Sequence, residues 1–213
     1  MLLMLTRRLN VAYRQQLERQ IDRNAYTREV DELPGKTLCL VGLGVIGRRC
    51  ASLGKAFGMR VIGVRRHPHP TPDVEQVFST DALHDALAQA DVVMVNLPST
   101  PDTRRLFNHD AFAAMKSGGY FFNAGRGATV DTEALTEAVR NGTLCGVGLD
   151  VTDPEPLPLD HPLWSMPNVI ITPHYSGARP HYLEHANRIF LENLQRFIAG
   201  EPLQFVVDKR TGY

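Results

Sequence analysis

A short stretch, TLCLVGLGVIGRRC (37–50), places the strongest constraint on how this chain can fold. It opens with a short apolar run of strand length, and the glycines that follow, Gly42, Gly44 and Gly47, have the spacing G-x-G-x-x-G. Apolar residues then recur at helical spacing, at Ile46, Cys50, Leu53 and Phe57. A strand, a glycine-rich turn and a helix in this order are typical of the first unit of an open α/β sheet.

Beyond Pro34 the chain continues to alternate strand and helix signals. The apolar runs are continuous rather than alternately apolar and polar, so both faces of the sheet should be covered. We therefore predict an α/β fold, a Rossmann-like doubly wound parallel sheet with flanking N- and C-terminal helices. The predicted strands are 37–42, 60–64, 91–97, 119–125, 144–150 and 168–174, and the predicted helices are 46–57, 81–90, 110–115, 131–142 and 179–199.

The composition is that of an ordinary globular chain, with 43% hydrophobic and 22% charged residues. Lys+Arg and Asp+Glu are 23 each, so no net charge attracts nucleic acid or an anionic membrane. The three cysteines lack ligand or redox spacing, which favours a reducing, cytoplasmic compartment. Apolar runs stay well below the roughly 18 residues that a membrane span needs.

The first twenty residues predict an amphipathic helix, because Leu5, Leu9, Tyr13 and Leu17 recur every four residues. Their opening apolar run is too short for a secretory signal. Early arginines without acids leave a transit peptide as an alternative, but we favour packing or a subunit contact. The predicted segments are an N-terminal helical segment (1–32), a dinucleotide-binding domain (33–175), and a C-terminal helix and tail (176–213), which the family resemblance given below implies to be the remnant of a substrate lobe.

The glycine motif also predicts chemistry. Gly42 permits a tight turn, Gly44 lets the backbone approach a pyrophosphate, and Gly47 lets the helix pack on the strand. The helix N-terminus offers free N–H groups and a partial positive charge to that anion. We expect this loop, with Leu43, Val45 and Ile46 between its glycines, to bind a dinucleotide; the alternative is a glycine-rich turn without function.

Two arginines follow the second predicted strand, in VRRHPHP (64–70). A dinucleotide-binding fold usually has an acid about 20 residues after the first glycine, where it binds the ribose 2′-OH. Arg65, with Arg66 beside it, can instead pair with a 2′-phosphate through its planar fork. The pair predicts NADP(H) as the cofactor, with NAD(H) and a merely solvated loop as the alternatives. We interpret His67 and His69 as loop residues rather than metal ligands.

Three polar residues follow later strands: Arg126 in NAGRG, Glu155 in DVTDPEPLP and His174 in ITPH. Each alone is compatible with a structural role, but together, beside a cofactor loop, they predict a site for carbonyl reduction. From residue 33 onward the chain resembles the D-isomer-specific 2-hydroxyacid dehydrogenase family. The blocks that carry the resemblance occur in the family's order and are GKTLCLVGLGVIGRRCASLGKAFGMRVIGV, LPSTPDTRRLFN, NAGRGATVDTEAL, GVGLDVTDPEPLP and NVIITPHYSGA.

The resemblance implies a role for each of these residues. Arg126 would hold the carboxylate and carbonyl of the substrate, and His174 would exchange a proton with the carbonyl oxygen as hydride is transferred. Glu155 would pair with that histidine and favour its charged form. Asp150 would bind the nicotinamide carboxamide. The backbone and side chains that would line the cofactor are those around Pro98, Thr103, Ala124 and Gly125.

The resemblance further implies D-specific reduction of a small 2-oxo acid, such as glyoxylate or hydroxypyruvate, by a homodimer. Family members carry a first lobe ahead of a helix like residues 1–20, and this chain starts after that lobe. A fragment, a shortened descendant and an inactive, cofactor-binding regulatory module all stay open. H-x-x-E-H at 181–185 leaves a zinc peptidase as a weaker alternative without an evident third ligand. Formate dehydrogenase is disfavoured, because its glutamine is replaced here by Glu155.

Overall fold

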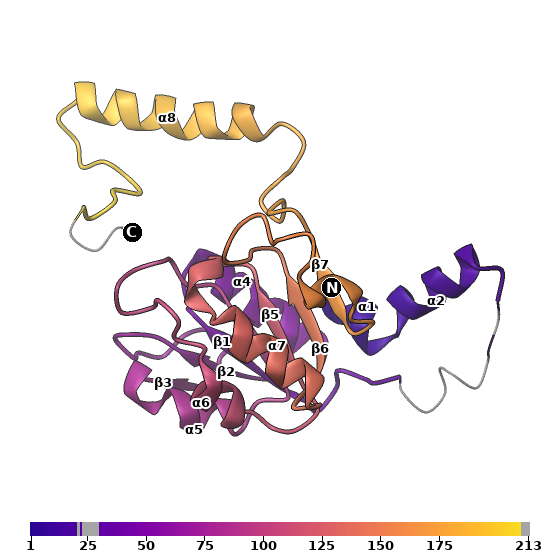
Figure 1. The fold of residues 1–213 in the computed structure, drawn as a ribbon. Helices are drawn as coiled ribbons and strands as arrows, with labels where there is room; N and C mark the ends of the chain where they lie inside the picture. Colours follow the sequence, from indigo (N-terminus) through magenta and orange to yellow (C-terminus); the bar gives the residue numbers. More distant parts are fainter. Residues whose placement is uncertain (21, 23–29, 210–213) are drawn as a thin grey trace. The chain divides into compact units, whose positions relative to one another are not determined.

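The computed structural model describes residues 1–20, 22 and 30–209. Parts of the predicted N-terminal segment (21 and 23–29) and of the predicted C-terminal tail (210–213) lie outside the described residues. The chain divides into two compact units, Met1–Pro173 and His174–Tyr213. Figure 1 traces both along the sequence.

The first unit is built on one seven-stranded, wholly parallel sheet with the strand order β3-β2-β1-β4-β5-β6-β7. The order reverses between β1 and β4, which makes their carboxyl ends the topological switch point where ligands bind in such sheets. The predicted Rossmann-like fold is confirmed. The strands are β1 (Thr37–Val41), β2 (Arg60–Val64), β3 (Gln76–Phe78), β4 (Val92–Val95), β5 (Gly119–Asn123), β6 (Leu144–Leu149) and β7 (Val169–Ile171).

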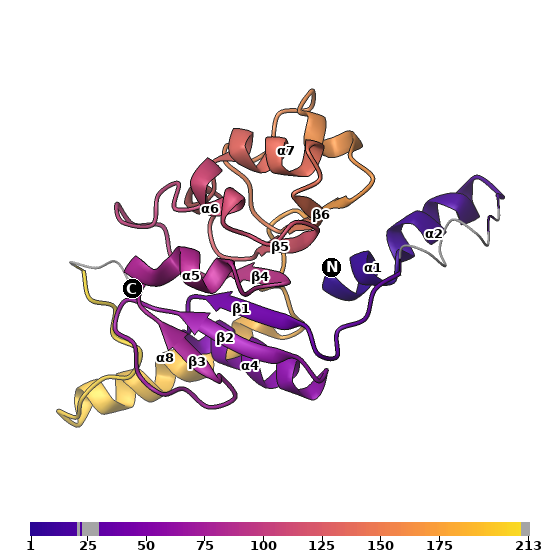
Figure 2. The same ribbon diagram turned by 90° about the horizontal axis from the view of Figure 1, so that it is seen from below.

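Helices cover both faces of this sheet, as the continuous apolar strands predict. Residues of α1 and α4 join one apolar cluster, and residues of α5, α6 and α7 join the other. Figure 2 shows α4 and α5 on opposite sides of the strands. The α-helices are α1 (Leu2–Thr6), α2 (Leu9–Leu17), α4 (Val45–Ala56), α5 (Leu83–Leu87), α6 (His109–Ala113), α7 (Thr132–Arg140) and α8 (Tyr182–Ile198), and the 3₁₀ helices are η1 (Thr80–Ala82), η2 (Gly127–Thr129) and η3 (Pro162–Ser165).

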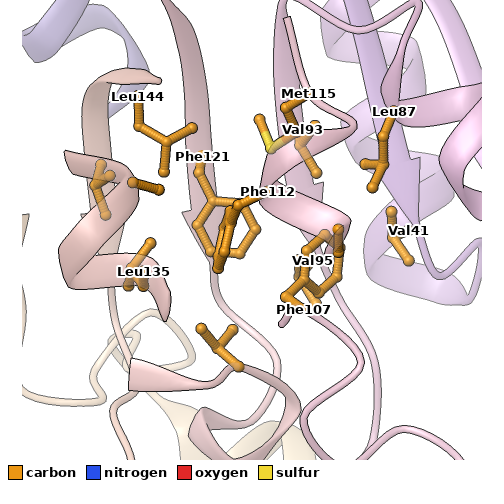
Figure 3. Close-up of a cluster of buried hydrophobic side chains, with 14 of the residues drawn as sticks. Val41, Leu87, Val93, Val95, Phe107, Phe112, Met115, Phe121, Leu135 and Leu144 are labelled. Carbon is orange, nitrogen blue, oxygen red and sulfur yellow. The ribbon is translucent and has the colours of Figure 1, made fainter. Parts of the chain in front are cut away.

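Three phenylalanines form the centre of the larger cluster (Figure 3). The Phe121 ring of β5 lies 5.1 Å from that of Phe107 and 5.2 Å from that of Phe112, both in edge-to-face arrangements. Such pairs add about 0.5–1.5 kcal/mol to the effect of burial alone. Two side-chain caps fix the helices around them: Asn108 accepts from the backbone of α6, and Asp131 from that of α7. Strand β5 and the helices α6 and α7 therefore share one aromatic, well-packed core.

The strand prediction missed β3, so the sheet has seven strands rather than six. Gln76–Phe78 is a three-residue edge strand that pairs with β2 and is only partly buried. A short, half-exposed edge strand leaves no continuous apolar run in the sequence, so the pattern used for the other strands could not detect it.

The prediction of one amphipathic helix over the first twenty residues is wrong. Arg8 adopts a left-handed conformation (φ 55°) and separates α1 from α2. Only α1 packs on the sheet, where Leu5 is 3% exposed and lies over Gly146 of β6. In α2 Leu9, Tyr13 and Leu17 are between 51% and 65% exposed. The four-residue period is real, but its apolar residues lie on two different helices. No helix in the described part of the chain is long and apolar enough to cross a membrane.

Candidate dinucleotide-binding site

The glycine motif forms the turn between β1 and α4, and two of its glycines are required by close packing. Gly42 has a φ of 103°, and a Cβ there would lie 2.7 Å from the backbone oxygen of Asn96. A Cβ on Gly47 would lie 2.0 Å from the backbone oxygen of Gly42. Gly44 is different, because a Cβ there would meet nothing within 4 Å. The turn is therefore tight on its inner side and open to an approaching ligand at Gly44.

The first turn of α4 presents backbone donors at this opening. Gly44 is the N-cap residue, and no side chain caps the helix. Uncapped N–H groups at a helix N-terminus, together with the helix dipole, suit a pyrophosphate. Val45 and Ile46 are 73% and 60% exposed beside the turn, whereas Leu43 is buried against Gly63. The loop therefore fits a dinucleotide, with Leu43 able to offer its backbone and not its side chain.

The two predicted phosphate-binding arginines stand at the carboxyl end of β2. The N–H of Arg65 donates to the oxygen of Phe78 in β3 (3.1 Å), so the missed strand fixes the backbone at this point. The Arg65 Nη1 lies 3.4 Å from the His69 Nδ1. The Arg66 Nη2 lies 2.9 Å from the Asp102 Oδ2. His69 thus lies beside Arg65 at the predicted phosphate site.

The loop after β4 is held in shape by Thr103. Its hydroxyl donates to the backbone oxygen of Pro98 (2.7 Å) and accepts from the N–H of Thr100 (2.8 Å). Both predicted lining residues, Pro98 and Thr103, therefore belong to one rigid turn at the switch point. Asn96, for which no sequence motif predicts a role, has a side-chain amide that is buried without a hydrogen-bond partner among the described residues. Buried polar groups are rarely left unpaired, which makes Asn96 an additional candidate for ligand contact.

The turn that carries Arg126 is organised by Asn123, a buried side chain at the end of β5. Its Oδ1 accepts from the N–H of Gly125 (3.0 Å), and its Nδ2 donates to the backbone oxygen of Arg126 (3.0 Å). The Thr129 hydroxyl donates to the same oxygen (2.7 Å). The backbone from Ala124 to Arg126 is thus fixed while the Arg126 side chain remains exposed. Sequence reasoning missed Asn123 and Thr129, although an asparagine directly before a glycine turn is a detectable signal.

The segment after β6 lies directly against this turn. A Cβ on Gly127 would lie 1.9 Å from the backbone oxygen of Thr152, so only glycine allows the two loops to approach this closely. The Asp150 carboxylate is buried (1% exposed) and accepts from the Thr172 hydroxyl at 2.6 Å. Glu155 lies exposed in the same segment. The fold therefore brings the loops that carry Arg126, Asp150 and Glu155 to one end of the sheet.

His174 follows β7 by three residues and is the first residue of the second unit. It is exposed, and its backbone is in the left-handed region (φ 51°), which non-glycine residues adopt mainly where the structure constrains them. In the same unit His181 lies 2.9 Å from Glu184 of the H-x-x-E-H motif. Among the described residues no group of three or more His, Cys, Asp or Glu is arranged to hold a metal ion.

Burial decides the state of the thiols. Burial raises the pKa of the Cys39 thiol, in β1 beneath the glycine turn, to about 12. It also raises the pKa of Cys50 and of Cys145. Since the thiolate is the reactive form of cysteine, a raised pKa disfavours thiol reactivity near neutral pH.

A parallel sheet of this strand order, with an open glycine turn and an uncapped helix at its switch point, defines a Rossmann-type dinucleotide-binding protein. The sequence model of one protein family, the D-isomer specific 2-hydroxyacid dehydrogenase NAD binding domain, matches residues 1–176. The chain belongs to this family. The family resemblance noted from the sequence motifs is confirmed.

Individual relatives agree with this assignment. The chain is 39% identical to a glyoxylate reductase of Aeropyrum pernix over 80% of its own length and 51% of the relative's. The chain is also 38% identical to a Corynebacterium melassecola protein, and the match covers 84% of this chain and 59% of that protein. The chain thus spans little more than half the length of these curated relatives.

Solved structures match over nearly the whole chain. A D-isomer specific 2-hydroxyacid dehydrogenase from Xanthobacter autotrophicus Py2, in complex with NADPH and MES, is 35% identical with a TM-score of 0.87, and the match covers 100% of this chain and 85% of that one. An NADPH-dependent glyoxylate/hydroxypyruvate reductase from Sinorhizobium meliloti, in complex with NADP and sulfate, is 30% identical with a TM-score of 0.87 over 99% and 66% of the two chains.

Proposed function

We propose that this chain binds NADP(H) in preference to NAD(H), and that it serves the reduction of a small 2-oxo acid, such as glyoxylate or hydroxypyruvate, to the D-hydroxy acid. The observation that carries the cofactor choice is the position of Arg65 and Arg66. They stand at the carboxyl end of β2, one strand away from the glycine turn, where a ribose-binding acid would repel a 2′-phosphate. The solved structure named as an NADPH-dependent glyoxylate/hydroxypyruvate reductase supports the cofactor proposal, and the relative named as a glyoxylate reductase supports the substrate class.

The residues of the first unit would bind and orient the reactants. The backbone from Gly42 to Gly47 would hold the pyrophosphate, and Asp150 would accept a hydrogen bond from the nicotinamide carboxamide. Arg126, on its fixed turn, would pair through its planar fork with the carboxylate of the substrate. When bound, NADP(H) supplies or accepts the hydride.

Proton transfer would fall to His174. It would donate a proton to the carbonyl oxygen of the 2-oxo acid during reduction and take it back in the reverse direction. Glu155 would pair with His174 in the assembled protein and orient it toward the oxygen that gains negative charge. D-specificity would follow from presenting one face of the carbonyl carbon to the cofactor.

The N-terminal helices would supply a subunit contact, giving a homodimer. The exposed apolar residues Leu9, Tyr13 and Leu17 of α2 support this proposal, because burying them would remove a sizeable apolar surface from water. The thiols of the described residues are free, which supports a reducing, cytoplasmic location.

The cofactor proposal is tested by replacing Arg65 with aspartate and Arg66 with alanine in one variant, and by titrating NADPH and NADH with calorimetry. We expect NADPH affinity to fall at least tenfold more than NADH affinity, since a charge-assisted bond to a phosphate contributes about 1.5–3 kcal/mol. Arg140→Ala, which removes one exposed charge at the end of α7, is the control and should affect neither cofactor. Equal losses for both cofactors would refute the proposed preference.

The proton-transfer role is tested in the complete protein with His174→Ala and a panel of 2-oxo acids. Turnover should fall by at least a hundredfold, within the range attributed to general acid catalysis, while NADPH binding changes little. Turnover that survives within a few-fold would show that His174 is not the proton donor.

A further inference from the structure

Asp102 lies in the loop after β4 and reaches across to the end of β2. Its Oδ2 is 2.9 Å from the Arg66 Nη2, and the two side chains are 77% and 40% exposed. The position of Asp102 is not arbitrary, because the neighbouring Thr103 fixes the loop through its bonds to Pro98 and Thr100. A negative charge is therefore held next to one of the two arginines proposed to bind the 2′-phosphate.

The two arginines contact side chains of different chemistry. Arg65 contacts the His69 ring, at 3.4 Å, whereas Arg66 contacts a carboxylate. A 2′-phosphate, like other phosphate monoesters, carries nearly two negative charges at neutral pH and needs the same guanidinium fork. A phosphate bound by Arg66 would compete with Asp102 for donors and be repelled by it. NADH lacks the 2′-phosphate and would meet neither effect.

Asp102 stands beside other acidic side chains. Asp102 also lines a cavity of about 420 Å³ between η1, α5 and the 102–110 segment. Of the charged residues around this cavity four are aspartates and two are arginines, with one histidine; the aspartates are Asp81, Asp85, Asp102 and Asp110. Asp102, the carboxylate beside Arg66, thus belongs to a cavity lining that holds more acidic than basic side chains.

We propose that Asp102 is a specificity-determining residue that acts against NADP(H), by competing with the 2′-phosphate for Arg66. The inference rests on the proposed function, because it requires the dinucleotide to bind at the glycine turn with its 2′-phosphate near the arginines. It adds to that function a counter-charge that holds NADPH affinity below what two unopposed arginines would give.

The test compares Asp102→Asn with the unchanged protein by calorimetric titration of NADPH and NADH. The amide keeps the size of the side chain and removes its charge. NADPH should bind about threefold to tenfold more tightly, the range expected when a partly exposed ion pair and a nearby repulsion are removed. NADH affinity should change less than about twofold. Asp85→Asn, which removes a charge from the same cavity, is the matched control and should change NADPH affinity less than about twofold.

Two further measurements attribute the effect to Arg66. The gain from Asp102→Asn should disappear when Arg66→Ala is already present, because the competition is for that side chain. The gain should also shrink at high ionic strength, where exposed charges are screened. Circular dichroism and the urea midpoint of each variant establish that it is folded.

The outcomes separate this inference from the cofactor proposal. If Arg66→Ala weakens NADPH selectively but Asp102→Asn leaves NADPH affinity unchanged or lowers it, the role of Asp102 is overturned and the NADP(H) preference stands. If the Arg65 and Arg66 variant loses NADPH and NADH equally, the proposed preference itself fails. A gain that persists in the Arg66→Ala background overturns the competition mechanism.

Discussion

Replacing Gly47 by alanine tests whether close packing inside the glycine turn shapes the backbone that we propose binds the pyrophosphate. The added Cβ would lie 2.0 Å from the backbone oxygen of Gly42, whereas such contacts in proteins do not fall below 3.0 Å. The obstacle is buried backbone rather than a movable side chain. The first turn of α4 and the end of β1 must therefore separate by about 1 Å, the difference between these two distances.

The expected loss of stability follows from two opposing effects. Over-packing a buried site costs about 1–3 kcal/mol, and a backbone obstacle points to the upper end of this range. Alanine regains about 1 kcal/mol of helix propensity relative to glycine. The free energy of unfolding should fall by about 2 kcal/mol, and displaced backbone donors should weaken dinucleotide binding at least tenfold.

Gly44→Ala is the matched control, because a Cβ there meets nothing within 4 Å and its φ of −72° suits alanine. Stability should change by less than about 1 kcal/mol, the difference between glycine and alanine as N-cap residues. Dinucleotide binding should still weaken, since this Cβ stands where the ligand approaches. Urea unfolding followed by circular dichroism gives the stability, and NADPH titration gives the affinity. The steric argument would be refuted if Gly47→Ala changed the free energy of unfolding by less than about 0.5 kcal/mol and the NADPH affinity by less than about twofold.

Two further predictions concern the core and a charged pair. Phe121→Ala should lower the free energy of unfolding by about 3–5 kcal/mol, because it opens a cavity between two aromatic rings, and Leu159→Ala, at a 94% exposed residue, should change it by less than about 0.5 kcal/mol. Partial burial alone would raise the pKa of Asp91, but the Thr37 N–H and the Lys116 ammonium outweigh it and lower that pKa. The charged Asp91 carboxylate therefore stabilises the fold above the ordinary aspartate pKa of about 4, and this stabilisation is lost as the pH falls through the lowered pKa. The urea midpoints of the original protein and of Asp91→Asn should therefore differ less at pH 3 than at pH 7. A constant gap over that range would contradict this.

Local patterns in the sequence located most of the fold. β2 coincides with its prediction, and β1 and α7 end within two residues of theirs, because each is specified by neighbours in the chain: apolar runs for strands, an acidic cap and a terminal Asn-Gly for the helix. The same patterns could not show that Arg8 interrupts the N-terminal helix. The break depends on tertiary packing: Leu5 of α1 packs over Gly146 of β6, whereas the apolar residues of α2 are exposed.

The candidate site divides in the same way. The glycine spacing located the tight turn between β1 and α4, since its demands on backbone conformation are local. The supporting residues escaped sequence reasoning because their partners are fixed by the fold. Asn123 became recognisable through its bonds on both sides of the Arg126 turn, and Gly127 through its approach to Thr152.

The sequence by itself determined a parallel α/β sheet with a glycine turn at the end of its first strand, because periodicity and glycine spacing act over a few residues. Only the tertiary structure decided what stands around the arginines that follow β2. Arg66 and Asp102 are 36 residues apart in the chain, and they meet because the order β2-β1-β4 brings the loops after β2 and β4 to the same end of the sheet. A pairing over that distance depends on strand order, and strand order is set by the packing of the whole sheet.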